Sequence, residues 1–479
     1  MPRFLLLCLC VLVSLLASMC TTDYPATAPY TSPVNPGPAT GTTPGPGSVA
    51  PPKRLFLTND KVKIGIDLNM GGAINYLSEA GSTVNMVNNV DLGRQVQTSL
   101  YAGPYPYSIN GKQPVPKWIN LGWNPVQTGD YYNHPARIVS YQQNRNQLYV
   151  KTVPLIWPLF DEPAECVMEH WIELRGNVVH VRCRFVVSRP DTTQYDARTQ
   201  ETPCVYLNGP YYRFITYAGF KPFTNDAVSE YTSVDNTTRY GTENWIALMN
   251  GQGRGVGLFR ANAFLFSSAY FGSTRTDGEY DESSGYINNQ DFLLIDHNGQ
   301  YEYEYDLVVG SVTDIRQFAY AQPRPATKPD FRFGQDRLGW HYYNARDQGW
   351  PIRNELNIRW ERVDMDKVTF RIQSPFVFWQ AADIPKIYLQ AAFKTSSPTV
   401  RLIWRKPGEI DSYDIPTRSV DFPVINDGQF RTYEIKLEGR AGWDEVIEQI
   451  SLSPADDKTQ SQRGSTVRIR SVTTNRPPG

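Results

Sequence analysis

The stretch KVKIGIDLNMGGAINYLS, residues 61–78, decides the fold class. Apolar residues recur at every second position from Val62 to Leu68, which is the period of a strand with one buried face. Gly71-Gly72 interrupts the pattern as a turn, and AINYLS follows as a second strand. The segment therefore predicts a β-hairpin close to the start of the folded part of the chain.

The same alternation recurs further along the chain, with turn residues between the runs. No long stretch before residue 310 shows apolar residues at a helical period. This pattern is typical of an all-β sandwich or barrel and argues against βαβ units. The clearest further runs lie at 165–188, 255–261 and 301–310.

A proline-rich segment, AQPRPATKPD at 321–330, predicts a linker between two domains. Short strand-like runs resume after it, among them KIYLQAAFK, TVRLIWR and VRIRSV. Residues 331–476 suit one jelly-roll sandwich in length and pattern. We therefore expect a first domain over 53–320 and a second over 331–476.

The first twenty residues hold Arg3 and an apolar run too short to span a membrane, which indicates a secretory signal. Cys20 follows small residues and resembles the lipidation site of a bacterial lipoprotein signal, although Met19 departs from that pattern. Residues 21–52 are rich in Pro, Gly and Thr and predict a disordered tether. We expect an exported protein, either secreted or a periplasmic or cell-surface lipoprotein.

Composition excludes several classes of function. The chain has 47 Lys+Arg against 48 Asp+Glu without a basic cluster, so nucleic acid is not an expected partner. Phe, Trp and Tyr make up 13% of the residues, which suits strands and surfaces that stack on sugar rings. We find no nucleotide, metalloprotease or serine-hydrolase motif, and predict neither cofactor nor metal. Cys166, Cys183 and Cys204 are expected to be buried thiols.

Two resemblances follow from these residues. The opening KVKIGIDLNMGGAINYLSEAG and the closing LLIDHNGQYEYEYDLVVG resemble the first hairpin and last strands of the galactose-mutarotase-like supersandwich, over about residues 54–320. That fold is shared by aldose epimerases and by domains of glycoside hydrolases and polysaccharide lyases. DGQFRTYEIKLEGRAGWDEVIEQISLSP, followed by VRIRSV, is similar to galactose-binding-like jelly rolls of secreted carbohydrate-active enzymes. The resemblance thus implies an all-β protein with an N-terminal supersandwich and a C-terminal sandwich.

One departure from the epimerases bears on the reaction. Their catalytic glutamate lies in a Pro-Gly-Glu turn before the last strand, whereas this sequence has Asn298-Gly299-Gln300. The resemblance therefore implies the fold of the epimerases without their chemistry.

Candidate sugar-binding residues begin with Asp91-Leu-Gly-Arg-Gln-Val-Gln97. Arg94 offers a planar fork of donors for a carboxylate or vicinal hydroxyls, and Gln95 and Gln97 each offer a donor and an acceptor. The alternative is a structural pair between Asp91 and Arg94 at the start of a strand.

The loop GWNPVQTGDYYNHP, residues 122–135, is a second candidate, because loops on a rigid β scaffold often carry function. A tryptophan there can stack on a sugar while amides and a carboxylate fix its hydroxyls. The alternative is a loop packed by its own aromatic residues. The residues concerned are Trp123, Asn124, Gln127, Asp130, Tyr131 and His134.

Two glutamates complete the candidates. Glu201 precedes a tyrosine-rich run that includes Tyr212, and Glu243 lies two residues before Trp245. Tyr212 and Trp245 are therefore candidate substrate-binding residues. Burial beside an aromatic ring raises the pKa of a carboxyl group, which a general acid needs. Either glutamate can equally be structural.

Three functions remain open at this stage. A glycoside hydrolase acting on a polysaccharide or oligosaccharide would draw its carboxylate pair from Glu201, Glu243 and Asp130. A polysaccharide lyase would use Arg94 and the amides on a uronate, with Tyr131 or His134 as base. A non-catalytic glycan-binding lipoprotein needs only the signal, the tether and the aromatic β-domains. We place the hydrolase first.

Overall fold

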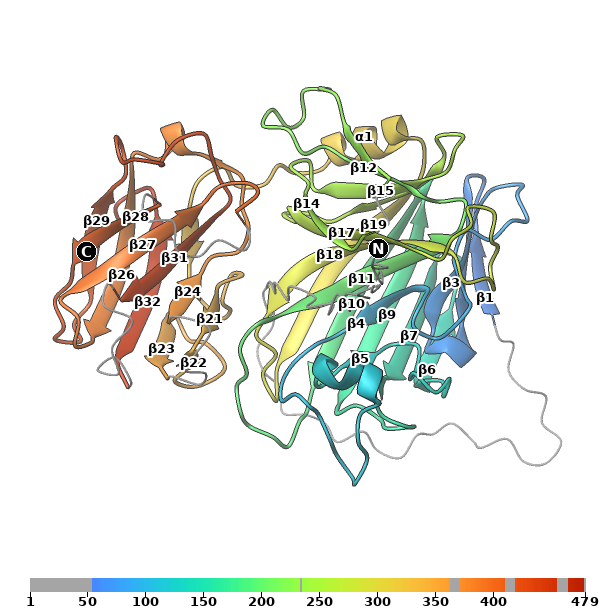
Figure 1. The fold of residues 1–479 in the computed structure, drawn as a ribbon, viewed down its shortest axis with the longest axis horizontal. Helices are drawn as coiled ribbons and strands as arrows, with labels where there is room; N and C mark the ends of the chain where they lie inside the picture. The colour runs from blue at the N-terminus through green and yellow to red at the C-terminus, as the bar shows by residue number, and fades with distance from the viewer. Residues whose placement is uncertain (1–53, 233–234, 362–369, 410–417, 455–463, 478–479) are drawn as a thin grey trace, which may run out of the picture.

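The fold consists of two β-sandwiches side by side (Figure 1). The computed structural model describes residues 54–232, 235–361, 370–409, 418–454 and 464–477. The predicted signal, Cys20 and the tether lie outside these residues. The sheets are antiparallel throughout, so the predicted all-β fold class is confirmed.

The first sandwich begins with a ten-stranded sheet. The predicted hairpin lies next to the edge strand of this sheet, and η1 (Leu68–Met70) occupies the turn. Two short strands, β5 (Pro125–Val126) and β8 (Leu155–Ile156), extend the sheet from β4. The remaining strands are, in order, β1 (Arg54–Thr58), β2 (Val62–Asp67), β3 (Ala73–Glu79), β4 (Val96–Ser99), β11 (Arg198–Asn208), β18 (Ser284–Leu293), β17 (Leu265–Phe271) and β14 (Thr237–Tyr240).

A nine-stranded sheet packs against one face of the first. Side chains alternate between the two faces of a strand, and this alternation explains the core of the sheet. Tyr301, Tyr303 and Tyr305 are buried, whereas Glu302 and Glu304 between them point away from the core. Its strands are, in order, β13 (Ser229–Tyr231), β12 (Arg213–Thr216), β15 (Trp245–Met249), β16 (Gly255–Phe259), β19 (Gln300–Gly310), β10 (Val178–Val187), β9 (Cys166–Arg175), β7 (Gln147–Val153) and β6 (Arg137–Gln143).

The hairpin of β9 and β10 carries two of the three cysteines in the described part of the chain. Cys183 lies opposite His170, and Cys166 lies opposite Val187. The thiols are therefore not opposed, and all three cysteines are buried and free, as predicted.

The second sandwich has its own core of buried aromatic and aliphatic residues. It holds a six-stranded and a five-stranded sheet, a two-stranded ladder of β25 (Trp379–Gln380) and β30 (Val446–Ile447), and η3 (Ala381–Asp383). The larger sheet comprises β22 (Ala345–Asp347), β23 (Leu356–Trp360), β32 (Thr466–Thr473), β26 (Lys386–Lys394) and β29 (Arg431–Lys436), with β20 (Asp330–Arg332) also on β32. The smaller comprises β21 (His341–Tyr343), β24 (Arg371–Gln373), β31 (Gln449–Pro454), β27 (Thr399–Arg405) and β28 (Ser419–Pro423).

A single α-helix among the described residues, α1 (Val312–Ala321), follows the last strand of the first sandwich. Ser311 and Asp314 form a capping box, which satisfies backbone donors at its first turn. Ile315 and Ala319 bury one face of the helix against the nine-stranded sheet. None of the helices described is long and apolar enough to cross a membrane.

Arg337 ties the two sandwiches together. Its guanidinium donates to Asp296 of the first sandwich at 2.9 Å and to Asp347 of the second at 2.5 Å. All three side chains are at least nine-tenths buried. Tyr240 adds a second link through a hydrogen bond from its hydroxyl to the carbonyl of Val377. The orientation of the sandwiches thus depends on buried polar contacts.

We predict that Arg337→Leu lowers the free energy of unfolding by about 3–5 kcal/mol at neutral pH, because it leaves two buried carboxylates without their cation. Urea unfolding measures the change. Arg332→Leu is the control, since Arg332 pairs with Asp330 at the surface and should cost less than about 1 kcal/mol. Equal losses in the two variants would contradict the bridging role of Arg337.

Candidate functional site

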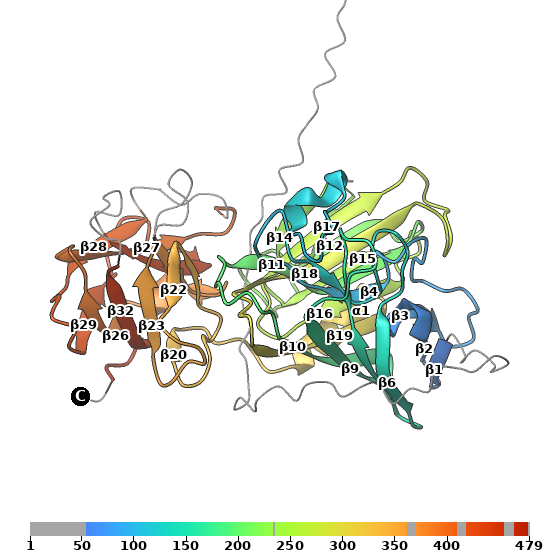
Figure 2. The same ribbon diagram turned by 90° about the horizontal axis from the view of Figure 1, so that it is seen from below.

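Strand β4 determines where a site can form. The hydroxyl of Thr98 bonds to His170 Nε2 at 3.0 Å, so this side chain faces the nine-stranded sheet. Gln97 and Ser99 point the opposite way, because side chains alternate along a strand. They reach the outer face of the ten-stranded sheet, over which η2 (Pro116–Leu121) lies (Figure 2).

A cavity of about 340 Å³ lies on this outer face. The strands provide its floor, and the loop before β4, η2 and the segment after β8 provide its walls. The lining combines aromatic rings with a few polar and charged groups, as in many ligand sites. It consists of Asp91, Gly93, Arg94, Gln97, Ser99, Tyr101, Lys117, Trp118, Leu121, Asn124, Val126, Trp157, Glu201, Tyr206 and Phe271.

A β-bulge brings Glu201 to the cavity. The register of β11 shifts between Glu201 and Cys204 against both neighbouring strands. Residues three apart would otherwise face opposite sides of the sheet, and the extra residue restores them to one side. Cys204 and Tyr206 consequently pack in one outer cluster, beside the Glu201 carboxyl group.

Two tyrosines hold the carboxyl group of Glu201. The Tyr286 hydroxyl donates to Oε1 at 2.5 Å, and the Tyr101 hydroxyl donates to Oε2 at 3.1 Å. Burial raises the pKa of Glu201 and outweighs the hydrogen bonds from Tyr286, Tyr101 and Ser99, which act in the opposite direction. No cation forms a salt bridge with Glu201 in the described part of the chain. Glu201 can therefore hold a proton within a polar and aromatic cavity.

The tyrosines themselves remain protonated. Burial, followed by the charge of Glu201, raises the pKa of both Tyr101 and Tyr286 well above its usual value. Each hydroxyl is thus a hydrogen-bond donor at neutral pH and a poor base.

Arg94 lies on the rim of the cavity and is already bound to the protein. It donates to Ser284 Oγ at 3.0 Å and to Glu282 Oε2 at 3.2 Å, and its Nε lies 3.7 Å from Asp91. These contacts fasten the loop before β4 to the start of β18. Asp91, which the sequence suggested only as a structural partner of Arg94, also lines the cavity.

Gly93 is required for the shape of one wall. A Cβ atom at this position would lie 2.7 Å from the ring of Trp157, which is closer than packed carbon atoms approach. The absence of a side chain lets the indole close the wall of the cavity.

Four of the predicted site residues line this cavity: Arg94, Gln97, Asn124 and Glu201. Gln97 and Asn124 also brace its floor, since each bonds to neighbouring backbone or side-chain groups. Tyr131 lies beside the cavity, with its ring centroid 5.9 Å from that of Trp157.

Gln95, Trp123 and Gln127 lie elsewhere than predicted. All three are at least 98% buried and none of them lines the cavity, so their side chains cannot receive a sugar. Gln95 adopts a φ of +90° before β4 begins and donates to the carbonyl of Asp91. Trp123 donates to Glu165, and Gln127 accepts from the backbone of Thr98.

Asp130 organises a loop and does not face the cavity. It is fully buried, and its carboxylate accepts from the backbone N–H groups of Tyr132, His134 and Asp161 at 2.7–2.9 Å. His134 Nδ1 lies 2.8 Å from the same carboxylate. The prediction of Asp130 as a catalytic group is corrected, because every approach to its oxygens is occupied.

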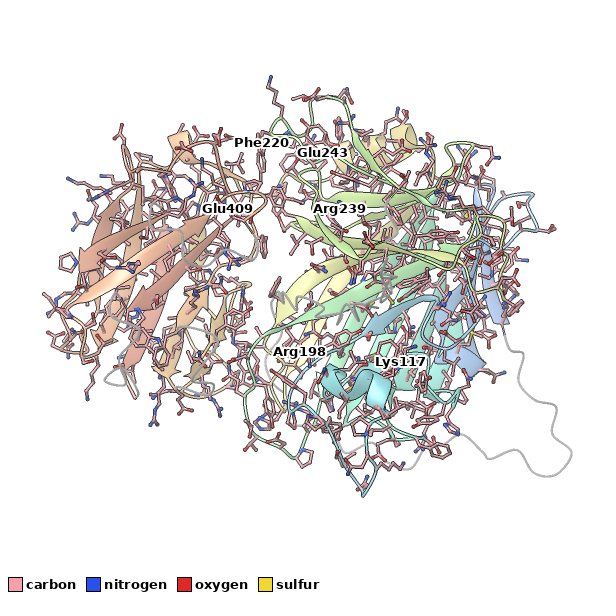
Figure 3. The ribbon with its side chains drawn as sticks, in the orientation of Figure 1. Lys117, Arg198, Phe220, Arg239, Glu243 and Glu409 are labelled. Carbon is pink, nitrogen blue, oxygen red and sulfur yellow. The ribbon has the colours of Figure 1, made fainter. Side chains whose placement is uncertain are left out.

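Glu243 anchors α1. Arg316 binds it through two nitrogens at 2.8 and 3.0 Å, and the Tyr320 hydroxyl adds a bond of 2.7 Å. Burial alone would raise the pKa of Glu243, but these bonds and those from Phe223 and Trp245 lower it. The expected raised pKa is therefore wrong. Figure 3 shows Glu243 and Lys117 at opposite ends of the first sandwich.

Trp245 and Tyr212 also lie away from the cavity. Trp245 is fully buried and donates to Glu243, which corrects its prediction as a substrate-binding residue. The guanidinium of Arg275 covers the ring of Tyr212 at 4.0 Å.

The sequence reasoning missed most of the aromatic wall. Tyr101 continues the alternation of Gln97 and Ser99 by one step, so the pattern offered a signal for it. Lys117, Trp118, Trp157 and Phe271 come from segments distant in sequence, and no local pattern marked them.

A larger hollow of about 780 Å³ lies between α1 and residues 225–228. Its charged lining residues are Asp226 and Arg316, and Arg316 is bound to Glu243. We therefore assign the candidate site to the smaller cavity. No group of three metal-ligating side chains occurs within the described ranges.

The fold can be compared with solved structures. A galactose mutarotase related enzyme from Lactobacillus acidophilus is 10% identical, covers 54% of this chain and 97% of its own, and has a TM-score of 0.36. A galactose mutarotase-like protein from Lactobacillus casei is 10% identical, covers 53% of this chain and 99% of its own, and has a TM-score of 0.34. The 4-alpha-glucanotransferase from Thermococcus litoralis is 11% identical and has a TM-score of 0.32. The match covers 53% of this chain and 37% of the glucanotransferase.

These similarities concern the arrangement of strands alone. Two of the three structures are described as galactose mutarotase-related or galactose mutarotase-like proteins, and the third is a glucanotransferase. No protein-family model matches the chain, and no curated protein sequence is significantly similar to it.

We predict that Tyr286→Phe raises the pKa of Glu201 further, because the variant loses a donor that stabilises the ionised carboxylate. Titration of the glutamate side-chain carbons by NMR measures this shift directly. Tyr303→Phe, which alters a hydroxyl on the inner side of the sheet, is the control and should leave Glu201 unchanged. An unchanged or lowered pKa in Tyr286→Phe would contradict the assignment.

We predict that Glu243→Gln destabilises the protein by about 1–3 kcal/mol, because the partly buried Arg316 loses its charged partner. Thermal unfolding measures the loss, and hydrogen exchange should locate it in α1. Exchange in the strands that line the cavity should stay unchanged. An unaltered stability in the Glu243→Gln variant would contradict the anchoring role of Glu243.

Proposed function

We propose that the protein is an exported glycoside hydrolase whose active site is the cavity on the outer face of the ten-stranded sheet. The observation that carries the proposal is the carboxyl group of Glu201, which has a raised pKa, lacks a salt bridge in the described residues and opens into an aromatic cavity. The proposal of export rests on the signal-like residues 1–20. Attachment to a membrane would depend on lipidation of Cys20.

Glu201 acts as the general acid in this proposal. A protonated carboxyl group donates its proton to the glycosidic oxygen as the bond to the leaving sugar breaks. Tyr101 and Tyr286 then stabilise the carboxylate that forms, since both hydroxyls point at its oxygens.

Asp91 is the second carboxylate of the cavity. Its Oδ1 accepts from the Gly93 N–H at 2.7 Å, and its side chain is 43% exposed. It can activate water or attack the sugar as a nucleophile, which are the two roles of the partner carboxylate in glycosidases. Asp91 replaces Glu243 and Asp130 in the predicted catalytic pair.

The aromatic rings bind the sugar. Trp118, Trp157, Tyr206 and Phe271 surround the cavity and present apolar faces to the C–H groups of a pyranose ring. Asn124 and Gln97 lie on the cavity floor, where their hydrogen bonds to neighbouring protein groups brace the site beneath the sugar.

A polysaccharide lyase is the second candidate, favoured by Arg94 and Lys117 on the rim, which suit the carboxylate of a uronate. A lyase also needs a base for the α-proton. Tyr101 and Tyr286 are held in the protonated form, and His134 is turned toward Asp130. Tyr131, the other base that the sequence offers, lies beside the cavity and does not line it. The hydrolase therefore has the better fit.

We predict that the protein releases reducing ends from a polysaccharide without a rise in ultraviolet absorbance. Glu201→Gln should lower the rate by about 10²–10⁴-fold, the usual contribution of a general acid, and Asp91→Asn should also impair turnover. Glu304→Gln, at an exposed position on β19, is the matched control and should keep full activity.

The other outcomes each select a different function. Reducing ends together with ultraviolet absorbance would establish the lyase. Retention on a polysaccharide in an affinity gel with no turnover on any substrate would establish a non-catalytic binder. Full activity in Glu201→Gln would refute the assigned acid.

A further inference from the structure

A chain of aromatic rings leads out of the cavity, and we call it the aromatic path. It starts at the lining residues Trp118 and Trp157 and continues through Tyr131, Tyr132 and Phe160. Ring centroids are 6.4 Å apart from Trp118 to Tyr131, 5.9 Å from Trp157 to Tyr131, 5.6 Å from Tyr131 to Tyr132, and 5.3 Å from Tyr132 to Phe160. The path is thus one contiguous surface joined to the cavity.

The outer rings of the path are exposed to solvent. Tyr131 is 38% exposed, Tyr132 40% and Phe160 55%. Eight aromatic side chains are exposed among the described residues, and three of them are neighbours on this path, which needs an explanation.

The backbone that carries the path is held firmly. Asp130 accepts from the N–H groups of Tyr132 and Asp161, which lie next to the exposed rings in sequence. His134 bonds to the same carboxylate and packs edge-on against Phe160 at 4.4 Å. One buried carboxylate therefore fixes both segments of the path before any ligand binds.

Charged groups border the path. Lys117 Nζ lies 4.7 Å from the ring of Trp118 and 5.9 Å from that of Tyr131, and forms no salt bridge within the described residues. Arg137 and Asp161 form an exposed pair beside Phe160. Aromatic faces bordered by polar groups match a glycan, which has apolar ring faces and hydroxyl edges. A stable protein interface would need a wider apolar core.

We infer that the substrate is a glycan chain, with one unit in the cavity and the following units on Tyr132 and Phe160. This inference rests on the proposed function for the identity of the cavity and adds that the chain length of the substrate is recognised. A protein built to act on a single sugar or a disaccharide would have no use for the outer rings. The site is thus open at one end, in the direction of Phe160.

The test uses the Glu201→Gln protein, so that binding is measured without turnover. An array of neutral and acidic polysaccharides, with disaccharides and longer oligosaccharides of cellulose, xylan and polygalacturonic acid, provides the probes. Tyr132→Ala and Phe160→Ala are introduced singly. Phe220→Ala is the matched control, because Phe220 is 52% exposed and lies far from Lys117 (Figure 3).

The expected result is tighter binding of longer chains, weakened about fivefold by either substitution on the path, as for the loss of one aromatic contact. Disaccharide binding should not change, and Phe220→Ala should bind as its parent does. All of these positions are exposed, so circular dichroism and the melting temperature should stay constant.

Three results, besides turnover that does not depend on chain length, would overturn the inference. They are equal binding of long chains by the substituted and parent proteins, no binding to any glycan of the array, and a dimer that Phe160→Ala dissociates without an effect on glycans. Turnover that does not depend on chain length would leave the hydrolase intact and reject the path. If the unsubstituted protein binds longer chains more tightly but does not turn them over, the hydrolase is rejected and the aromatic path is retained.

Discussion

The constraint on which the structure depends is that a β-strand has two faces and that the ten-stranded sheet buries only one of them against its partner sheet. Val96 and Thr98 of β4 fill the space between the sheets, and Gln97 and Ser99 are left on the outer face. A site can form there without disturbing the core. Its walls must come from loops and η2, because the strands supply only a floor.

Two glutamates of the first sandwich show that environment, and not residue type, assigns a role. Both belong to the same sandwich and have aromatic neighbours, yet burial prevails at Glu201, whereas hydrogen bonds and Arg316 prevail at Glu243. The two pKa shifts differ in direction because Arg316 pairs with Glu243, whereas no cation pairs with Glu201 among the described residues. A guanidinium within 3 Å turns a buried carboxylate into an anchor, and tyrosine hydroxyls alone leave it able to exchange a proton.

The strands were predictable because their signal is local. The hairpins at 61–78 and 165–188 and the alternating run at 301–310 appear as β2–β3, β9–β10 and β19. The site was predictable only where it coincides with such a run, as at Gln97. Trp118 and Trp157 line the same cavity as Glu201 because of the course of the loops, and no sequence periodicity predicts that course. The bulge at Glu201 also places its side chain on the face opposite to the one that strict alternation would predict. Asp130 and Trp123 were predicted wrongly as site residues because the same residue types occur in buried structural loops and in binding loops.

The position of β32 governs the order in which the two sandwiches can form during synthesis. This last strand lies inside its sheet, where it pairs with β20, β23 and β26. Every strand of the first sandwich precedes residue 311, so that unit can close while later residues are still being added. The second sandwich cannot close until its C-terminal residues have left the ribosome. A nascent chain stalled between the two events would carry a complete candidate site beside an open, unpaired sheet.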